Sequence, residues 1–210
     1  MATKSMALWG LLLAAVAVYT VVASDPDLTV DFNVTNPTAT DFMGTFDLTT
    51  PGQGMAFPVP STNIPGLVGL GLTPVFFEFG PMSQIDPHTH PRATEVFYVL
   101  SGSIDVGFVD TNNDLFELTV NNGDIFVFPK GMMHWQRNSG TGTASGFSVL
   151  NSENPGTLQI IKGLFTANGL GLPDIVLATA LNIVGVSGAD GQIDAIKTYV
   201  AQRDNVTLSS

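Results

Sequence analysis

Short runs of β-branched and aromatic residues alternate with turn-forming residues through the middle of the chain. Runs of this kind, spaced by roughly ten residues and separated by Gly, Asn, Asp and Ser, are typical of antiparallel strands joined by tight turns. The runs are Val75–Phe79, Glu95–Leu100, Ile104–Val109, Leu115–Val120, Ile125–Phe128, Gly146–Leu150 and Leu158–Ile161. The pattern predicts an antiparallel β-sandwich or barrel whose core spans residues 74–161.

A different pattern begins after Gly171, where two apolar sets follow, each headed by an aspartate. The first set is 175–177 and 181, and the second is Ile193, Ile196 and Val200. The second set has the i, i+3, i+7 spacing of one helix face. Because Asp is favoured at helix N-caps, Asp174 and Asp190 are each expected to cap a helix. The sequence therefore predicts an all-β core followed by C-terminal α-helices within residues 173–203.

Residues 1–24 have the composition of a secretory signal peptide. Lys4 is followed by an almost purely apolar run over residues 6–22, which ends in the small residues Ala23 and Ser24. A basic start, an apolar middle and a small-residue end are typical of signal peptides, and the run is short for a membrane span of about 20 residues. A single anchoring helix is the alternative. We expect cleavage after Ala23 or Ser24, leaving residues 25–210 as one secreted domain without a membrane span.

Two Asn-x-Thr sequons are candidates for glycosylation if the chain is secreted. They begin at Asn33 and Asn205, near the two ends of the chain, where exposure is expected. This tripeptide is the acceptor for N-linked glycosylation in secreted proteins. Both asparagines are therefore predicted glycosylation sites.

Composition and charge exclude several classes of protein. Seven basic and eighteen acidic residues give a net charge of −11, which excludes nucleic acid as a partner because phosphate binding needs clustered Lys and Arg. The chain is 44% hydrophobic and only 12% charged, so it has ample apolar area for a buried core and is not a disordered chain. It has no cysteine, which excludes a disulfide framework and a thiolate site.

The three histidines of the chain fall into one pattern with a glutamate. His88 and His90 are two residues apart, so on a strand their side chains project from the same face. Glu95 begins the next apolar run, and His134 follows a strand and the turn at residues 129–131. Three imidazoles and a carboxylate suit Mn, Fe or Zn, and around an octahedral metal they leave two positions open. The alternative is three unrelated histidines.

Two segments around these residues resemble the conserved boxes of the cupins, and specifically those of the plant germins and germin-like proteins. The segments are HTHPRATE, from His88 to Glu95, and GDIFVFPKGMMHWQRN, from Gly123 to Asn138. The first box, H-x-H-x4-E-x6-G, is met by His88, His90, Glu95 and Gly102. The second box, G-x5-P-x-G-x2-H-x3-N, is met by Gly123, Pro129, Gly131, His134 and Asn138. The likeness continues from Ser24 through the Asn154-Pro155-Gly156 box to both expected helices.

The resemblance implies a cupin β-jelly-roll barrel that holds manganese (Mn²⁺) through His88, His90, Glu95 and His134. It also implies a homo-oligomer of the apoplast or cell wall, a hexamer built as a trimer of dimers whose terminal helices clasp their neighbours. A superoxide dismutase-type activity is implied, with the same four residues catalytic through the metal. The alternative is a non-catalytic extracellular protein that binds or stores metal or a small ligand, because a fold does not determine function.

Three features depart from the germin pattern. Asn33 stands where germins carry the first of two paired cysteines, and Met82 and Ser83 replace a glycine pair. The two asparagines that bind oxalate in germins correspond to Val68 and Ile85. An apolar side chain cannot donate a hydrogen bond to a carboxylate and makes the approach of an anion costly. Oxalate oxidase activity is therefore not expected.

Two further expectations concern access to the metal. An apolar cavity beside it would suit a small hydrophobic ligand, and its candidate lining residues are Val68, Ile85, Met132 and Met133. Loss of the signal peptide would remove one basic residue, so the mature chain would carry 6 − 18 = −12 charges and repel anions over long range. Turnover of superoxide would need a locally positive approach, for which Arg92 and Lys130 are the candidates.

Overall fold

The computed structural model describes residues 35–36, 38–43, 55–58, 63–184 and 189–203. The predicted signal peptide and both predicted glycosylation sites, Asn33 and Asn205, lie outside the described residues. Across the part of the chain that is described, no helix is both long and apolar enough to cross a membrane.

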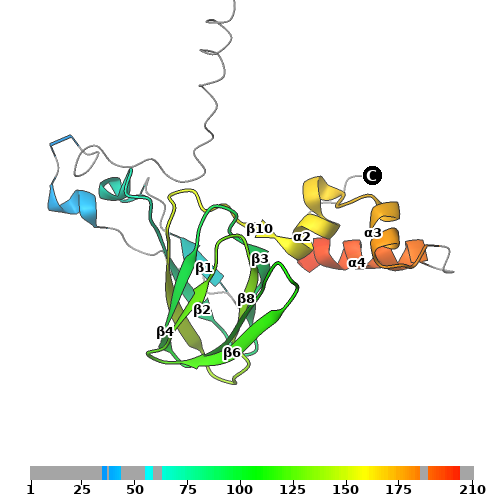
Figure 1. Cartoon of the computed structure of the whole chain (residues 1–210), viewed down its shortest axis with the longest axis horizontal. Helices are drawn as coiled ribbons and strands as arrows, with labels where there is room; N and C mark the ends of the chain where they lie inside the picture. The colour runs from blue at the N-terminus through cyan, green and yellow to red at the C-terminus, as the bar shows by residue number, and fades with distance from the viewer. Residues whose placement is uncertain (1–34, 37, 44–54, 59–62, 185–188, 204–210) are drawn as a thin grey trace, which may run out of the picture.

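The described strands form two five-stranded antiparallel sheets (Figure 1). The order in the first sheet is β1 (Met55–Pro58), β2 (Thr73–Phe79), β9 (Ala144–Leu150), β4 (Glu95–Ser101) and β7 (Ile125–Phe128). The order in the second sheet is β10 (Leu158–Gln159), β3 (Gln84–Thr89), β8 (Met133–Arg137), β5 (Ser103–Val109) and β6 (Leu115–Asn121). The predicted antiparallel β architecture is confirmed. No ladder joins the two sheets among these ten strands, so the barrel implied by the resemblance is not closed by hydrogen bonds.

Alternate residues of the strands pack into an apolar core. In β2 and β9 every second residue is buried, as expected for strands with one face on a core. The ring of Phe97 lies 5.6 Å from that of Phe77 and 6.3 Å from that of Phe128, measured between centroids. Phe128 in turn stacks on His134 at 4.5 Å. The apolar core therefore reaches the side chains that the sequence singled out.

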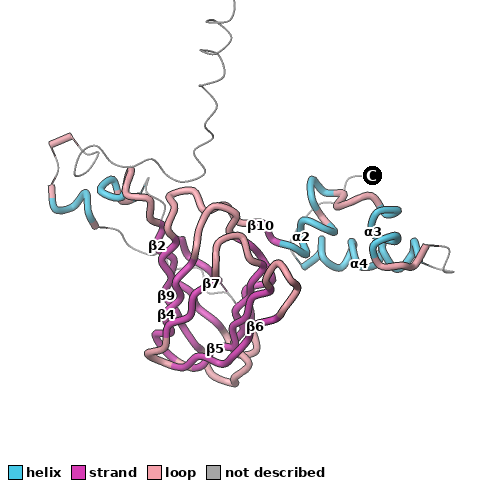
Figure 2. The backbone as a smooth tube through the Cα atoms, viewed as in Figure 1, coloured by secondary structure: helices cyan, strands magenta, loops and turns pink. Residues whose placement is uncertain are grey.

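The carboxyl-terminal residues form a separate helical unit beside the sheets (Figure 2). Its α-helices are α2 (Ile160–Phe165), α3 (Asp174–Ala180) and α4 (Ala189–Arg203). Short 3-10 helices lie at η2 (Ala39–Phe42), η4 (Pro65–Leu67) and η5 (Ala167–Gly169). Leu177, Ala178 and Ile193 form a small core of the helical unit, apart from the core of the sheets. The predicted C-terminal helices are confirmed.

Two details of the helical region differ from the sequence prediction. The run predicted as a strand to residue 161 ends as β10 at Gln159, and α2 begins at the next residue, because a short apolar run fits a strand and a helix equally well. Asp174 is not the N-cap of α3, since Pro173 holds that position. The carboxylate of Asp174 instead accepts a hydrogen bond from Lys197 Nζ at 2.6 Å. Asp190 is the second residue of α4.

Candidate metal centre

The fold brings the three histidines and the glutamate together from three strands. His88 lies on β3 directly opposite His134 on β8, and His90 follows β3 by one residue. Glu95 is the first residue of β4. All four side chains are buried, and one nitrogen or oxygen atom of each lies within 4.8 Å of the others. The structure thus places all four sequence-predicted site residues in one group.

Backbone carbonyl groups determine which nitrogen of each imidazole faces the centre of the group. The Nδ1 atoms of His88, His90 and His134 lie 2.8, 2.6 and 2.9 Å from the carbonyl oxygens of Asp86, Gly156 and Met132. A carbonyl oxygen can only accept, so each Nδ1 carries the proton and donates it. The lone pairs of the three Nε2 atoms are therefore left for a metal, as is usual for ligating histidines.

Two buried residues that the sequence analysis did not single out hold Glu95. Ser148 Oγ donates to Glu95 Oε1 at 2.6 Å, and Gln136 Nε2 donates to the same oxygen at 3.4 Å. The second carboxylate oxygen, Oε2, lies 3.2 Å from His90 Nε2 and 3.4 Å from His134 Nε2. Gln136 is two residues from His134, so the period of the strand could have placed both on the inner face. One oxygen of Glu95 is thus occupied by the protein while the other faces the histidines.

Burial and mutual contacts shift the proton affinities of the group. Burial, followed by the charge of His134, lowers the pKa of His88 to about 4. Burial acts to lower the pKa of His90, but the close contact with Glu95 and its negative charge outweigh it and raise that pKa. Burial acts to raise the pKa of Glu95, but its close contacts with His134 and His90 and the hydrogen bond from Ser148 outweigh it and hold that pKa far below its ordinary range. Near neutral pH the group therefore contains an ionised carboxylate and a neutral His88.

The donor group fits a metal ion. Glu95 Oε2 and His134 Nε2 are buried and have no hydrogen-bond partner. These acceptors face the other imidazole nitrogens, and a buried acceptor without a partner costs free energy. A cation would satisfy all four atoms at once. Three imidazole nitrogens and one carboxylate oxygen, without a thiolate, form a mixed set suited to a first-row divalent metal.

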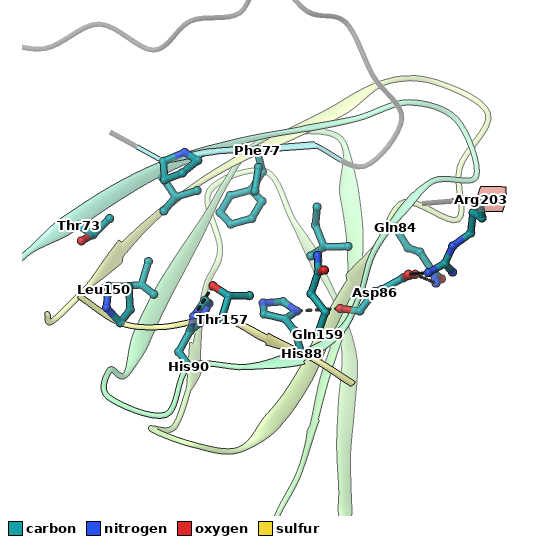
Figure 3. A pocket seen from close by; sticks show the side chains of 15 residues that line it. Thr73, Phe77, Gln84, Asp86, His88, His90, Leu150, Thr157, Gln159 and Arg203 are labelled. Carbon is teal, nitrogen blue, oxygen red and sulfur yellow. Dashed lines mark hydrogen bonds and ion pairs between the residues drawn. The ribbon is translucent and has the colours of Figure 1, made fainter. Parts of the chain in front are cut away.

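A cavity of about 560 Å³ opens beside His88 and His90 (Figure 3). Its apolar lining includes Val75, Phe77, Ile85 and Leu150, and its polar lining includes Thr73, Gln84, Asp86, Thr157, Gln159 and Arg203. Ile85 lines the cavity as the sequence predicted. Val68, Met132 and Met133 do not line it, and Val68 instead follows η4 with 38% of its surface exposed.

The charged groups near the cavity differ from those expected. Neither Arg92 nor Lys130 lines the cavity. Arg203, the last residue of α4, reaches its edge and pairs with Asp86 Oδ2 at 2.9 Å (Figure 3). A smaller cavity of about 220 Å³ shares Asp86 and Arg203 with the first and adds Lys162. The cations that line these two cavities therefore come from the helical unit.

Comparison with known proteins places these features in a family. Residues 46–187 match the sequence model of the family described as Cupin. Germin-like protein 1-3 of Oryza sativa subsp. japonica is 39% identical over 170 residues, which is 79% of this chain and 74% of that protein. Germin-like protein subfamily 2 member 4 of Arabidopsis thaliana is 43% identical over 141 residues, which is 67% of this chain and 61% of that protein. The chain spans 58% to 61% of the length of five curated relatives.

The fold of this chain is similar to that of solved structures. A recombinant oxalate oxidase in complex with glycolate superposes with a TM-score of 0.74 and 28% sequence identity, over 85% of this chain and 99% of that chain. Residues 46–187, which match the cupin family model, contain both sheets and the buried His-Glu group. The chain belongs to the cupin family, and within it to the germin-like proteins.

Proposed function

We propose that the chain is a secreted, manganese-binding protein of the plant apoplast with a superoxide dismutase-type activity. The observation that carries the proposal is the buried group in which three imidazole nitrogens and one carboxylate oxygen face one another within 4.8 Å. Such a set is complete only with a cation at its centre. The lack of a thiolate and the likeness to germins favour manganese over a structural zinc.

The residues of the chain would have distinct roles in this chemistry. Bound manganese supplies one-electron redox chemistry, which turns two superoxide ions and two protons into dioxygen and hydrogen peroxide. The three backbone carbonyls keep the histidines in the ligating tautomer. Ser148 and Gln136 hold Glu95, whose negative charge helps to neutralise a divalent ion. The cavity beside His88 and His90 gives a small anion a route to the group.

Elemental analysis of the purified protein, with superoxide and oxalate assays on the same sample, tests this proposal. We expect one manganese per chain and superoxide turnover that Glu95→Ala abolishes. Glu117→Ala, which removes an exposed carboxylate on β6, is the matched control and should change neither quantity. Stoichiometric zinc, or manganese without superoxide turnover, would contradict the redox proposal.

The second candidate function is non-catalytic binding of a small hydrophobic or amphiphilic ligand. The cavity favours it, because about 560 Å³ lies within the range of pockets for organic ligands and is far larger than superoxide needs. Val75, Phe77 and Ile85 form an apolar wall next to His88. A thermal-shift screen of small aromatic and aliphatic acids on the manganese-loaded protein tests this function. Binding without turnover, weakened by Ile85→Asn, would favour it over redox catalysis.

We do not propose oxalate oxidation as the activity. Ile85, which stands where germins carry an asparagine, lines the cavity with an apolar side chain. Val68, at the second such position, lies outside the lining. The likeness to an oxalate oxidase in complex with glycolate makes the oxalate assay the necessary check. Oxalate turnover by the purified protein would overturn this reading of Ile85.

We also propose secretion after loss of residues 1–24, glycosylation at Asn33 and Asn205, and assembly of the domain 25–210 into a homo-oligomer, with a hexamer expected. Exposed apolar side chains on the helical unit support assembly, since isolated proteins seldom expose many of them together. They include Ile175, Val176, Leu181, Val184, Ile196 and Tyr199. Mass spectrometry of the secreted protein reads the mature amino terminus and the glycans, and light scattering gives the oligomer mass. A monomer would contradict the assembly proposal.

A further inference from the structure

Arg92 joins two loops that lie far apart in the sequence. It lies between β3 and β4, and the loop after β9 passes beside it. Its backbone N–H donates to the carbonyl of Pro155 at 3.1 Å. Its side chain donates twice to Asn154, from Nε to the carbonyl oxygen at 2.6 Å and from Nη2 to Oδ1 at 2.7 Å. Three donors of one residue therefore hold two consecutive residues of the other loop.

The next residue of the second loop holds a histidine of the metal centre. The carbonyl of Gly156 accepts the hydrogen bond from His90 Nδ1 at 2.6 Å. This bond determines the tautomer of His90 and also constrains the orientation of its ring. The position of the Gly156 carbonyl depends on residues 154 and 155, which Arg92 holds. An exposed arginine outside the cavity is thus connected to a buried imidazole through one short turn.

A glycine at position 156 allows the Arg92 guanidinium to lie close to the backbone, for two reasons. Its φ of +66° lies in the left-handed region, which favours glycine. A Cβ atom at this position would lie 2.8 Å from Arg92 Nη2, closer than side chains pack. The turn therefore brings the guanidinium and the backbone together at the residue whose carbonyl meets His90.

We propose that Arg92 is a positioning residue for His90, acting through Asn154, Pro155 and Gly156, and does not serve to attract an anionic substrate. The inference rests on the proposed metal-binding function of the site. The bidentate grip on Asn154 uses the planar guanidinium, which a lysine ammonium cannot reproduce. Loss of the grip lets the 154–156 turn shift and weakens the constraint on the His90 ring.

Manganese affinity of the metal-free full chain is the first test. We expect Arg92→Ala to weaken manganese binding by about 10-fold, the lower end of the range for residues that orient metal ligands, and Arg92→Lys to give an intermediate loss. Arg137→Ala is the matched control. Arg137 is the last residue of β8, and because its neighbour Gln136 is buried on the inner face, the side chain of Arg137 projects from the opposite face. If Arg92→Ala does not fold, Asn154→Ala removes one of the side-chain contacts and should give a smaller loss in the same direction.

The ring nitrogens of His90 provide a readout that does not need bound metal. The chain has three histidines, so ¹⁵N-histidine labelling and magic-angle-spinning NMR at pH 8 resolve three rings, and a His90→Gln variant assigns one of them. We expect Arg92→Ala to move or broaden the His90 signals alone and Arg137→Ala to move none. Unchanged His90 signals with manganese affinity within two-fold of wild type would overturn the proposal, as would equal changes in Arg137→Ala. If the wild-type chain binds no manganese and Arg92→Ala still changes the His90 signals, the result would refute the proposed function and leave the positioning role standing.

Discussion

The candidate metal centre and the helical unit depart from ordinary packing in opposite directions. In the metal centre, polar side chains lie buried beside phenylalanines, and Glu95 Oε2 and His134 Nε2 have no hydrogen-bond partner. In the helical unit, apolar side chains are exposed, with Ile175 at 63% and Tyr199 at 68%. Buried polar atoms lose their hydration, and large exposed apolar patches are unfavourable in water, so each region has a cost in the isolated chain.

The comparison indicates which partner would satisfy the unpaired groups of each region. Four facing acceptors are satisfied by a cation, because another protein donor could meet only one or two of them. An exposed apolar surface is satisfied by a second apolar surface of complementary shape. The two regions are also connected, since Arg203 at the end of α4 pairs with Asp86, whose carbonyl holds His88.

Removal of one donor from the metal centre should have the largest effect. His88→Ala or His134→Ala deletes one of four protein ligands, and we expect at least about a 100-fold loss of manganese affinity, beyond the usual effect of residues that merely orient ligands. Elemental analysis after dialysis measures the metal that remains. Stoichiometric manganese in either variant would show that the four residues are not the ligand set.

Removal of the hydroxyl that holds Glu95 should have the next largest effect. Ser148→Ala leaves the buried Oε1 without its shorter hydrogen bond, and bonds to charged groups contribute about 1.5–3 kcal/mol. We expect the free energy of unfolding of the metal-free protein to fall by that amount in urea titrations. Ser101→Ala, which removes an exposed hydroxyl paired with Ser145, should change it by less than about 0.5 kcal/mol. Equal effects of the two variants would argue against a special role for Ser148.

Acidification should weaken the metal-free protein through His88. The folded pKa of about 4 lies below the ordinary value of 6.5, so the unfolded chain binds a proton that the folded chain does not. The resulting stability is present above pH 6.5 and is lost as the pH falls toward 4. Between pH 7.5 and pH 5 this loss amounts to about 2 kcal/mol.

A comparison with His88→Gln isolates this contribution. The raised pKa of His90 acts in the opposite direction, because the stability that it contributes is fully present below pH 6.5 and is lost as the pH rises above that value. The lowered pKa of Glu95 removes stability only below its ordinary value of 4.5. Urea titrations of both proteins at pH 7.5 and pH 5 should therefore show a steeper loss in wild type than in His88→Gln. Parallel losses would contradict a neutral, buried His88.

The smallest effect on the stability of the folded chain should come from the exposed face of α4. Ile196 is 40% exposed, so Ile196→Ser should change the free energy of unfolding of a monomer by about 0.5 kcal/mol or less. It should nevertheless lower the mass of the oligomer measured by light scattering. Ile193→Ser, one turn away and fully buried, is the contrasting variant and should disrupt the helical core itself. An unchanged oligomer mass in Ile196→Ser would place the assembly interface elsewhere.

The strands with an unbroken alternation of apolar positions were predictable, whereas two strands of the site were not. β2 and β9 alternate buried and half-buried positions along their whole length, which is the signal that the sequence carries. β3 and β8 carry His88, Pro87, His134, Gln136 and Arg137, so their apolar period is broken. Polar residues that belong to a site interrupt the apolar alternation, so the pattern does not predict the strand that carries them.

The sequence by itself determined which residues were candidate donors, since residue types, spacing and the likeness to the germin boxes single out His88, His90, Glu95 and His134 without reference to any contact. Only the tertiary structure decided what surrounds them. Ser148 and Gly156 come from distant segments, and Arg92 changed from a candidate for attracting anions to a residue bound to Asn154. The physical reason is that ligand identity is a local chemical property, while ring tautomer, carboxylate orientation and cavity lining depend on contacts between strands and loops that only folding brings together.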